Sequence, residues 1–544
     1  MEKRNTTATQ LSPQEKMVRG SIWMSAGNII SRLLGAIYII PWYAWMGENG
    51  RNANSLFTMG YNIYALFLMI STAGIPSAIA KQISHYNSLN EYKVSARLFK
   101  QALVLMGGIG VVAAAIMYAA SPILAAGNPD LIPVMRSLSV AVLIFPMMSA
   151  VRGFFQGNHD MMPTAISQIV EQVARVFYML LTTFIIMKVL EGEYTTAVVQ
   201  STFAAFIGML GAVGVLIYYW LKQKPVFDYL QAHSENQLTV STRNLFVNIA
   251  RDAIPFIIVG SAITILKIFD QYTFFGIMNT FTNYSQNQLY ELFSVFSANP
   301  DKLTMVVIAL ATSISSTALP LISEAYTLKD HKGLAKLITD NLQLFCFIMF
   351  PATLGMISLA YPLNTLFYEP SRLGSAVLIE ACIVGVIIGL YMLVSSTLQG
   401  LGHHLATLKY LAAGFLVKMV LQVPFIYFFE VYGPLLSTAL GLLLAAFFSL
   451  RDIHRISHFN AKLTLRRGVL ISLLSLVMMF VVLLARFAFS FVLSPEHKLT
   501  AFVLIILVAA IGAGVYGYLA LKLRLADKLI GSRVASLRRK LHIK

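Results

Sequence analysis

The chain repeats one pattern from end to end, in which apolar runs of about 20 residues alternate with short polar connectors. A run of that length crosses the ~30 Å hydrocarbon core of a bilayer as an α-helix. The pattern therefore predicts an all-α polytopic membrane protein with about fourteen spans. We expect these spans at residues 21–47, 57–80, 98–122, 131–155, 163–190, 197–222, 248–275, 302–325, 338–361, 374–398, 407–429, 433–450, 467–492 and 499–522.

Two pairs of short segments match at nearly the same spacing. ISTAGIPSAIA (70–80) matches ISSTALPLISE (314–324) at an offset of 244 residues. FFQGNHDMMPTA (154–165) matches TLQGLGHHLATL (397–408) at an offset of 243 residues. Each match alone is weak, but the agreement of the two offsets indicates an internal repeat.

The repeat contains six spans, an even number, so both copies should have the same orientation in the membrane. Extending the second alignment pairs Arg175 with Lys418. We expect two six-helix lobes related by an axis along the membrane normal, with two extra C-terminal helices. The expected parts are a cytoplasmic arm (1–20), an N-lobe (21–222), a cytoplasmic linker (223–247), a C-lobe (248–450), spans 13 and 14 (451–523) and a basic cytoplasmic tail (524–544).

Composition and charge agree with this prediction. Of the 544 residues 57% are hydrophobic and only 12% are charged, against about 25% charged in a soluble protein. The net charge of +17 gathers in the segments 3–19, 81–100, 451–467 and 533–544. Positive charge marks the cytoplasmic side, so we expect both termini there, in a multi-pass protein of the plasma membrane. The charge then reflects topology and contact with membrane lipids, and no nucleic-acid partner is expected.

The chain shows no pattern typical of an enzyme. It has no GxxxxGK[ST] motif and therefore no ATPase of its own, and its longest polar stretches are connectors of about 25 residues. Both cysteines fall in expected spans, and the histidines have no metal-ligand spacing. We expect a transporter without a cofactor or a metal.

Arg32 lies well inside the first expected span, with no acidic residue within four positions. An unpaired guanidinium in hydrocarbon costs about 2.5–3.5 kcal/mol, so a partner must offset that cost. One interpretation is a structural arginine that donates to backbone carbonyls of a bent helix. The interpretation that we favour is a cavity-facing ligand for an anion, because a planar guanidinium donates two parallel hydrogen bonds to phosphate.

Among the charged residues expected to line the pathway, the basic ones outnumber the acidic ones. This excess predicts a modestly cationic pathway and an anionic cargo. The basic residues are Arg32, Arg175, Arg251 and Lys267, and the acidic ones are Glu171, Asp252 and Asp270.

Two pairs among these charged residues have a simpler interpretation. Glu171 and Arg175 are four positions apart on one helix, and Lys267 and Asp270 are three apart, so each couple could be an internal ion pair. As a functional hypothesis, Asp270 or Glu171 binds a coupling cation or proton.

Two regions are candidates for gating. Arg152, Gln156 and Gly157 follow the fourth span and should lie near the cytoplasmic mouth, although helix termination explains Arg152 equally well. Gly74 and Pro76 interrupt the second span. Broken helices are tolerated where they line a cavity or change shape, and packing alone is the alternative explanation.

Three short motifs resemble those of the MOP exporter superfamily. They are Ser31-Arg32-Leu33-Leu34-Gly35, Gly74-Ile75-Pro76 and Arg152-Gly153-Phe154-Phe155-Gln156-Gly157. With the fourteen expected spans in two lobes, the chain is similar over nearly its whole length to MurJ-type lipid II flippases, within the polysaccharide biosynthesis or export branch.

The resemblance implies a V-shaped molecule of MOP/MATE-like fold that alternates between inward-open and outward-open states. Its cargo would be undecaprenyl-diphosphate-linked peptidoglycan precursor (lipid II), moved from the cytoplasmic to the outer leaflet for cell-wall synthesis. Spans 13 and 14 would form a groove for the polyprenyl tail. Without an ATPase, the energy source would be the membrane potential, Na⁺ or H⁺. The cell-wall synthesis machinery is a candidate partner.

The resemblance also assigns residues. It places the essential span-one arginine on Arg32 and the basic residue at the start of span eight on Lys302. The second basic position of span one falls on Tyr38, and the span-two arginine falls within the apolar residues 66–71. The candidates to supply the missing charge are Lys267, Arg175 and Arg251.

Three rival functions stay open. A flippase for another lipid-linked polysaccharide unit is chemically close. A cation-coupled multidrug antiporter of the MATE type usually has twelve spans and acidic sites, unlike this chain. A membrane scaffold without transport would not need charges inside its spans.

Overall fold

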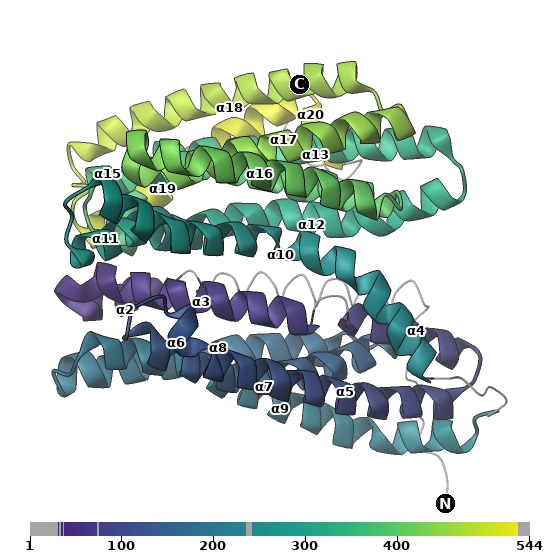
Figure 1. Ribbon diagram of the computed structural model, residues 1–544. Coiled ribbons are helices and arrows are strands. Elements are labelled where there is room, and N and C mark those ends of the chain that lie inside the picture. Colours follow the sequence, from purple (N-terminus) through teal and green to yellow (C-terminus); the bar gives the residue numbers. More distant parts are fainter. Residues whose placement is uncertain (1–30, 32–33, 36, 73–74, 236–241, 531–544) are drawn as a thin grey trace, which may run out of the picture. The chain divides into compact units, whose positions relative to one another are not determined.

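The computed structural model describes residues 31, 34–35, 37–72, 75–235 and 242–530, and it contains no β-strand in this part of the chain (Figure 1). Contacts divide the chain into two compact units. Unit 1 comprises the described residues of Met1–Tyr38 and Gly60–Ser261, and unit 2 those of Ile39–Met59 and Ala262–Lys544.

Unit 1 is built from α-helices and one π-helical turn. Two longer helices, α3 (Gly50–Thr72) and α10 (Thr242–Phe281), belong partly to each unit. The helices of unit 1 alone are α4 (Ile75–Ser88), α5 (Tyr92–Ala119), α6 (Ser121–Leu124), α7 (Leu131–Gly157), α8 (Met162–Phe184) and α9 (Tyr194–Ala232), with a π-helical turn, η2 (Ile185–Val189).

Unit 2 contains a corresponding set and the C-terminal helices. Its elements are α2 (Ile39–Met46), η1 (Gly47–Asn49), α11 (Gln286–Phe293), η3 (Ser294–Ala298), α12 (Asn299–Thr327), α13 (His331–Ser358), α14 (Ala360–Phe367), α15 (Arg372–Gly400), α16 (His404–Phe429), η4 (Glu430–Tyr432), α17 (Gly433–Ser457), α18 (Ala461–Ser490), α19 (Lys498–Lys522) and α20 (Leu525–Ile530).

The protein is a multi-pass membrane protein. In the described part of the chain, 11 helical stretches are long and apolar enough to cross a bilayer. One of them, His404–Ser457, holds both α16 and α17, which pack against each other. The all-α membrane fold is confirmed, and the number of fourteen spans stays a prediction.

The internal repeat is visible in the backbone of the two units. After α7, His159 N donates to Gln156 O at 3.0 Å, and 243 positions later Gly402 N donates to Gln399 O at 2.9 Å. His159 and Gly402 both adopt positive φ, at 60° and 78°. The neighbouring backbone hydrogen bonds of the two turns also correspond, so the offset predicted from the sequence applies to the structure.

Close helix pairs also repeat. A Cβ added to Gly208 of α9 would lie 2.5 Å from Glu171 O of α8. A Cβ added to Gly441 of α17 would lie 2.5 Å from Gly414 O of α16, which is 243 positions after Glu171. In hydrocarbon, where helices gain no hydrophobic free energy from association, such small residues allow the backbones to approach.

Gly74 of the interruption expected in the second span lies outside the described residues, between α3, which ends at Thr72, and α4, which begins at Ile75. Pro76 is the second residue of α4, a position that tolerates proline because its missing N–H would have no helical partner. Gly157, the last residue of α7, packs on this helix: a Cβ there would lie 2.8 Å from Ala80 O. Gly157 thus allows α7 to approach α4 closely.

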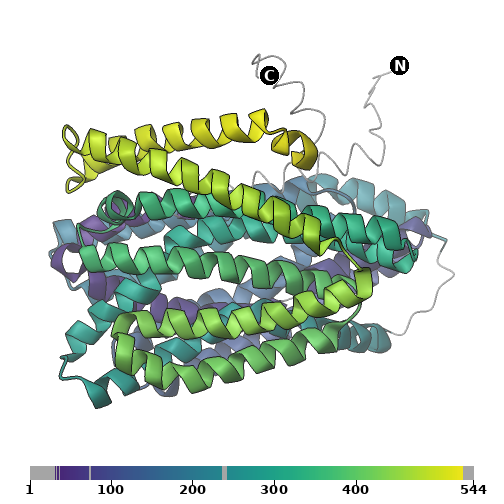
Figure 2. The ribbon, with the colours of Figure 1, turned by 90° about the horizontal axis from the view of Figure 1, so that it is seen from above.

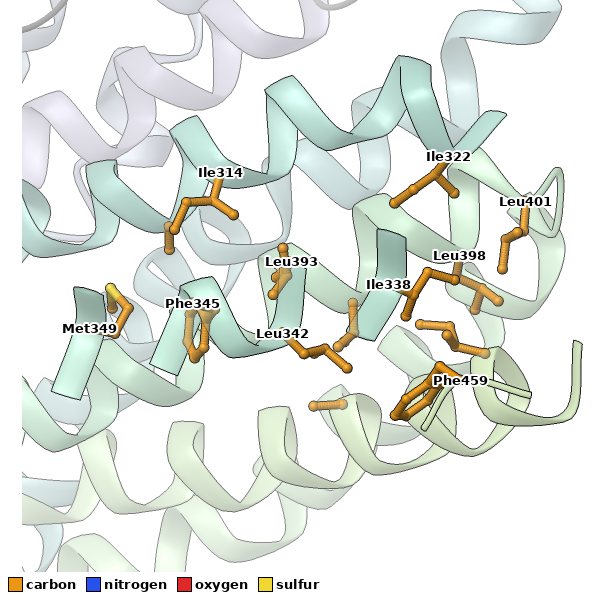
Figure 3. Packing of buried hydrophobic residues seen from close by; sticks show 14 of the residues in the cluster. Ile314, Ile322, Ile338, Leu342, Phe345, Met349, Leu393, Leu398, Leu401 and Phe459 are labelled. Carbon is orange, nitrogen blue, oxygen red and sulfur yellow. The ribbon is translucent and has the colours of Figure 1, made fainter. Parts of the chain in front are cut away.

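The interior of unit 2 is a large apolar cluster between α12, α13, α15 and α17 (Figure 3). The C-terminal pair α18 and α19, yellow-green and yellow in Figure 2, lies side by side along unit 2. A second cluster, which includes Phe347, Met478 and Tyr516, joins this pair to α13.

Within unit 2, the segment 39–59 is joined to the rest of the unit by polar contacts that the sequence does not reveal. Arg51 donates to Glu291 at 2.9 Å and also pairs with Glu369. Asn54 Nδ2 donates to Asn299 Oδ1 at 2.7 Å in a buried position. These partners are hundreds of positions away in the chain, so local patterning could not identify them.

Two expected connectors are partly helical. α9 continues beyond residue 222 to Ala232, because helical hydrogen bonds need no hydrocarbon around them. In the expected connector 276–301, α11 begins at a capping box in which Ser285 and Gln288 exchange hydrogen bonds.

The glycine contacts give a testable prediction. Gly208→Ala and Gly441→Ala should each lower the free energy of unfolding by about 1–3 kcal/mol, because the added methyl group forces the helix pair apart. Gly214→Ala, on α9 with nothing within 4 Å of its Cβ, is the matched control and should not destabilise. Thermal unfolding in detergent measures the difference, and equal stability of Gly208→Ala and Gly214→Ala would contradict the close packing.

Candidate functional site

The first candidate site is a charged cluster in unit 1, between α7 and α8. Glu171 accepts from two guanidiniums: Arg152 Nη2 at 2.8 Å and Arg175 Nη2 at 3.2 Å. Arg152 Nε also donates to Ser167 Oγ at 3.0 Å. The side chains of the three charged residues are between 10% and 18% exposed. One carboxylate between two guanidiniums leaves the cluster with a net charge of +1.

Arg175 keeps part of its hydrogen-bonding capacity. Its Nε is buried and has no acceptor among the described residues. Tyr38, Tyr61 and Tyr64 lie close enough to interact with its charge. Arg175 therefore carries positive charge to the surroundings of Tyr38, the position at which the resemblance expects a basic residue. A guanidinium with an unused donor can bind an oxyanion.

Gly35, in the first expected span, lies beside the same helix. A Cβ added to Gly35 would contact Gln172 Nε2 of α8 at 3.4 Å. Gln172 is one turn of helix from Arg175 and is itself buried. Gly35, three positions after Arg32, is thus next to α8.

The second candidate site is a polar network inside unit 2. Lys418 of α16 is completely buried, and its Nζ donates to Asp270 Oδ1 of α10 at 2.6 Å. The other acceptors come from α17: Thr438 Oγ1, Pro434 O at 3.3 Å and Ser437 Oγ at 3.4 Å. Four oxygens from two helices thus surround one ammonium, as a buried charge requires.

Gln422 extends this network by one turn of α16. Its Nε2 donates to Asp270 Oδ1 at 2.8 Å and to Thr273 Oγ1 at 3.0 Å. Its Oε1 accepts from Ser437 Oγ at 2.6 Å. The network therefore binds α10, α16 and α17 together with no net charge.

A small cavity of about 60 Å³, lined mostly by apolar side chains, lies next to Asp270 in unit 2. Lys267 and Asp301 form an ion pair on its wall. A water molecule needs ~10–15 Å³ on this measure, so the cavity has room for a few waters. Lys302, the next residue in α12, places its ammonium 4.6 Å from the ring centroid of Phe57.

The structure corrects one local interpretation. Lys267 and Asp270, three positions apart, do not pair with each other, because Lys267 pairs with Asp301 and Asp270 with Lys418. The other pair predicted from spacing, Glu171 with Arg175, is present. Each of the two groups pairs with a residue of another helix and not with its neighbour on α10.

The structure describes only some of the remaining predicted residues. Arg32 and Gly74 lie outside the described residues, as do the side chains of Pro76 and Arg251, although both of these residues belong to helices. Arg152 belongs to the charged cluster. Gln156 and Gly157 are in the last turn of α7. The roles of all these residues in binding or gating stay predictions.

Apart from Asp270, the residues that surround Lys418 were not among those predicted from the sequence. One signal pointed to them, since the repeat pairs Arg175 with Lys418. The two cations occupy equivalent helix positions but have different partners: Arg175 binds a carboxylate on its own helix, and Lys418 binds one on another helix. In the described part of the chain, no three His, Cys, Asp or Glu side chains gather as metal ligands.

The chain is similar to known membrane proteins over most of its length. Residues 17–326 match the family of polysaccharide biosynthesis proteins. The chain is 32% identical to lipid II flippase MurJ of Bacillus subtilis (strain 168), over 96% of this chain and 98% of that protein. It is 25% identical to the uncharacterized membrane protein YabM of the same organism, over 93% and 92% of the two chains.

Solved structures show the same fold. A lipid II flippase MurJ in an inward closed conformation matches with a TM-score of 0.58 and 16% identity, over 91% of this chain and 98% of that one. A mutant of the MATE transporter VcmN of Vibrio cholerae matches with a TM-score of 0.59 and 12% identity, over 82% and 98%. At such identities the likeness concerns the fold, and it confirms the predicted MOP/MATE-like architecture.

The buried network predicts strong coupling between Lys418 and Asp270. Lys418→Met should cost about 3–5 kcal/mol of unfolding free energy, because it leaves the Asp270 carboxylate without a counter-charge. Lys418→Met combined with Asp270→Asn should cost clearly less than the sum of the two single changes. Thermal unfolding of the purified protein measures all three variants.

The control is the ion pair between Arg455 and Asp452, in which the Arg455 side chain is 62% exposed. Arg455→Met should cost at most about 1 kcal/mol. If Lys418→Met is no more harmful than Arg455→Met, or if the double variant is additive, the two buried groups are not coupled.

Proposed function

The chain belongs to the family of polysaccharide biosynthesis proteins, and we propose that it moves lipid II from the inner to the outer leaflet of the membrane by alternating access. The observation that carries this proposal is the 32% identity to a lipid II flippase over 96% of the chain. A match of that extent includes both repeat units and the two C-terminal helices.

The chemistry of unit 1 supports an anionic cargo. A diphosphate headgroup cannot cross hydrocarbon alone, because its charges would lose their hydration. The cluster of Arg152, Glu171 and Arg175 has a net positive charge. The N–H at Arg175 Nε has no acceptor among the described residues. We propose that Arg175 contributes to binding of the diphosphate, together with Arg32.

Orientation and partners belong to the same proposal. Both termini would lie in the cytoplasm, as the basic segments indicate, and the cell-wall synthesis machinery would consume the transported lipid. The chain would act as a transporter and not as an enzyme. A flippase for another lipid-linked polysaccharide is the second candidate, favoured by the description of the family.

The test of this proposal is complementation in cells depleted of the protein. The wild-type chain should prevent lipid II from accumulating in the inner leaflet. The readout is the fraction of lipid II that an external probe can reach, which is the fraction in the outer leaflet. Arg32→Ala and Arg175→Ala should reduce transport at least about tenfold, because a charge-assisted hydrogen bond contributes ~1.5–3 kcal/mol.

Arg455→Ala, at an exposed guanidinium, is the matched control and should complement fully. Immunoblots of membranes verify that each variant is present at the wild-type level. Full complementation by Arg32→Ala would remove the role assigned to that side chain. Normal lipid II distribution after depletion, with accumulation of a different polyprenyl-linked glycan, would favour the second candidate.

We also propose that the membrane potential drives transport. The two carboxylates considered for a coupling ion already have internal cations: Lys418 binds Asp270, and Arg152 and Arg175 bind Glu171. A sodium ion or a proton would have to displace one of these groups. An anion that leaves an inside-negative cell instead gains about 2.3 kcal/mol per charge per 100 mV.

Transport in cells or vesicles should therefore slow when valinomycin and external K⁺ collapse the potential, and it should persist when choline replaces Na⁺. Asp270→Asn, combined with Lys418→Met to keep the network neutral, should retain the dependence on potential. Transport that requires Na⁺, or a pH gradient at zero potential, would contradict this mechanism and favour ion coupling.

A further inference from the structure

A groove of about 600 Å³ runs along unit 1 between α5, α7 and α9. Its floor is aromatic, because the ring centroid of Phe154 lies 4.3 Å from that of Phe99, 5.2 Å from that of Trp220 and 5.2 Å from that of Phe227. Ile217, on the wall, is 53% exposed. The groove is therefore apolar inside and open at the surface of the unit.

One end of the groove is polar. Lys100 of α5 and Lys224 and Asp228 of α9 line it. The start of α5 and the end of α9 meet beyond this end of the groove, since Ser234 Oγ donates to Asn90 O at 3.2 Å. At 1.5 Å per residue, each lysine is about 12 Å from that end of its helix. Among the described residues, none of the ion pairs includes these three side chains.

The internal repeat locates the corresponding place in unit 2. The turn before α5 and the turn before α13 both contain a residue with positive φ, Asn90 at 58° and Lys329 at 56°. They are 239 positions apart. The same offset puts Ile338 of α13 in the place of Phe99 of α5.

In unit 2 the chain itself fills this place. Gly208 and Gly441 make equivalent helix contacts and are 233 positions apart. The same offset places Ile453 of α17 at the position that corresponds to Trp220 of α9. Ile453 and Ile338 belong to one buried cluster, into which Phe459 inserts from the connection between α17 and α18 (Figure 3).

The connection between α17 and α18 also covers the position in unit 2 that corresponds to Lys100 of unit 1. Asn460 N donates to Thr339 Oγ1 at 3.1 Å, and Thr339 occupies the place that Lys100 has in unit 1. In unit 1, α9 continues through the positions that correspond to this connection. Phe227 packs against Trp220 with 5.6 Å between ring centroids, and a groove stays open beside them. The helices α5, α7 and α9 are each long and apolar enough to cross a bilayer, so lipid chains are available to fill an apolar groove between them.

We infer that an anionic phospholipid of the surrounding bilayer occupies this groove, with its phosphate between Lys100 and Lys224 and an acyl chain over the aromatic floor. The volume falls within the range typical of sites for small molecules, ~300–1,000 Å³. With Asp228 the polar end has a net charge of +1, which matches one phosphodiester. A zwitterionic lipid brings a second cation to the same place and should bind less tightly.

The test is titration of the purified full-length protein with phosphatidylglycerol and with phosphatidylcholine, followed by native mass spectrometry. Phosphatidylglycerol should bind more tightly. Lys100→Gln combined with Lys224→Gln should weaken its binding roughly 10- to 30-fold, to the level of phosphatidylcholine, because each surface lysine contributes about one power of ten or less. Ile217→Trp should fill the groove and reduce binding of both lipids.

The matched control is Lys93→Gln combined with Lys222→Gln, two exposed lysines on the same helices that do not line the groove. It should bind phosphatidylglycerol like the wild type. Equal binding of the two lipids, or no effect of the Lys100 and Lys224 changes, would overturn the inference. Displacement of phosphatidylglycerol by a polyprenyl phosphate that depends on the same lysines would assign the groove to the tail of the cargo instead. No transport is measured, so failure here leaves the proposed function untouched.

Discussion

The structure depends on one constraint: charges placed inside membrane-spanning helices must find partners within the protein, because hydrocarbon offers none. In unit 2 the Lys418 ammonium meets this requirement with Asp270 and three further oxygens, and three helices are joined as a result. In unit 1 one carboxylate, Glu171, serves two guanidiniums. The first arrangement is neutral and closed, whereas the second keeps a positive charge and an unused donor. The two lobes therefore differ in chemistry although they share a backbone plan.

That shared plan is maintained by glycine contacts and helix-ending turns and not by the charges. Gly208 and Gly441 bring equivalent helix pairs together, and His159 and Gly402 end equivalent turns. These features constrain the backbone and leave the side chains of the repeat free to diverge. The pair Arg175 and Lys418 illustrates this divergence, as do the groove of unit 1 and the filled interior of unit 2. One copy of the repeat can thus carry ligand-binding groups while the other supplies internal stability.

The predictable part of the candidate site was local. Spacing alone identified Glu171 with Arg175, since residues four positions apart face the same side of a helix. The same rule suggested a pair of Lys267 and Asp270 that is not formed, because their partners are 34 and 148 positions away. Arg152, predicted at the mouth of the pathway, proved to be the second partner of Glu171. Helical spacing says which groups can meet on one helix, but it contains no information about the helix packed opposite.

The sequence by itself determined the class of the protein, because the length and hydropathy of each span respond to the bilayer and not to the rest of the chain. It also determined the internal repeat, because two copies of one fold retain similar turns and proline positions. Only the tertiary structure decided which charges are neutralised, which polar groups surround Lys418, and that Phe459 packs into the interior of unit 2 while a groove stays open in unit 1. Those outcomes depend on contacts between segments far apart in the chain, where distance and orientation, rather than residue type, select the partner.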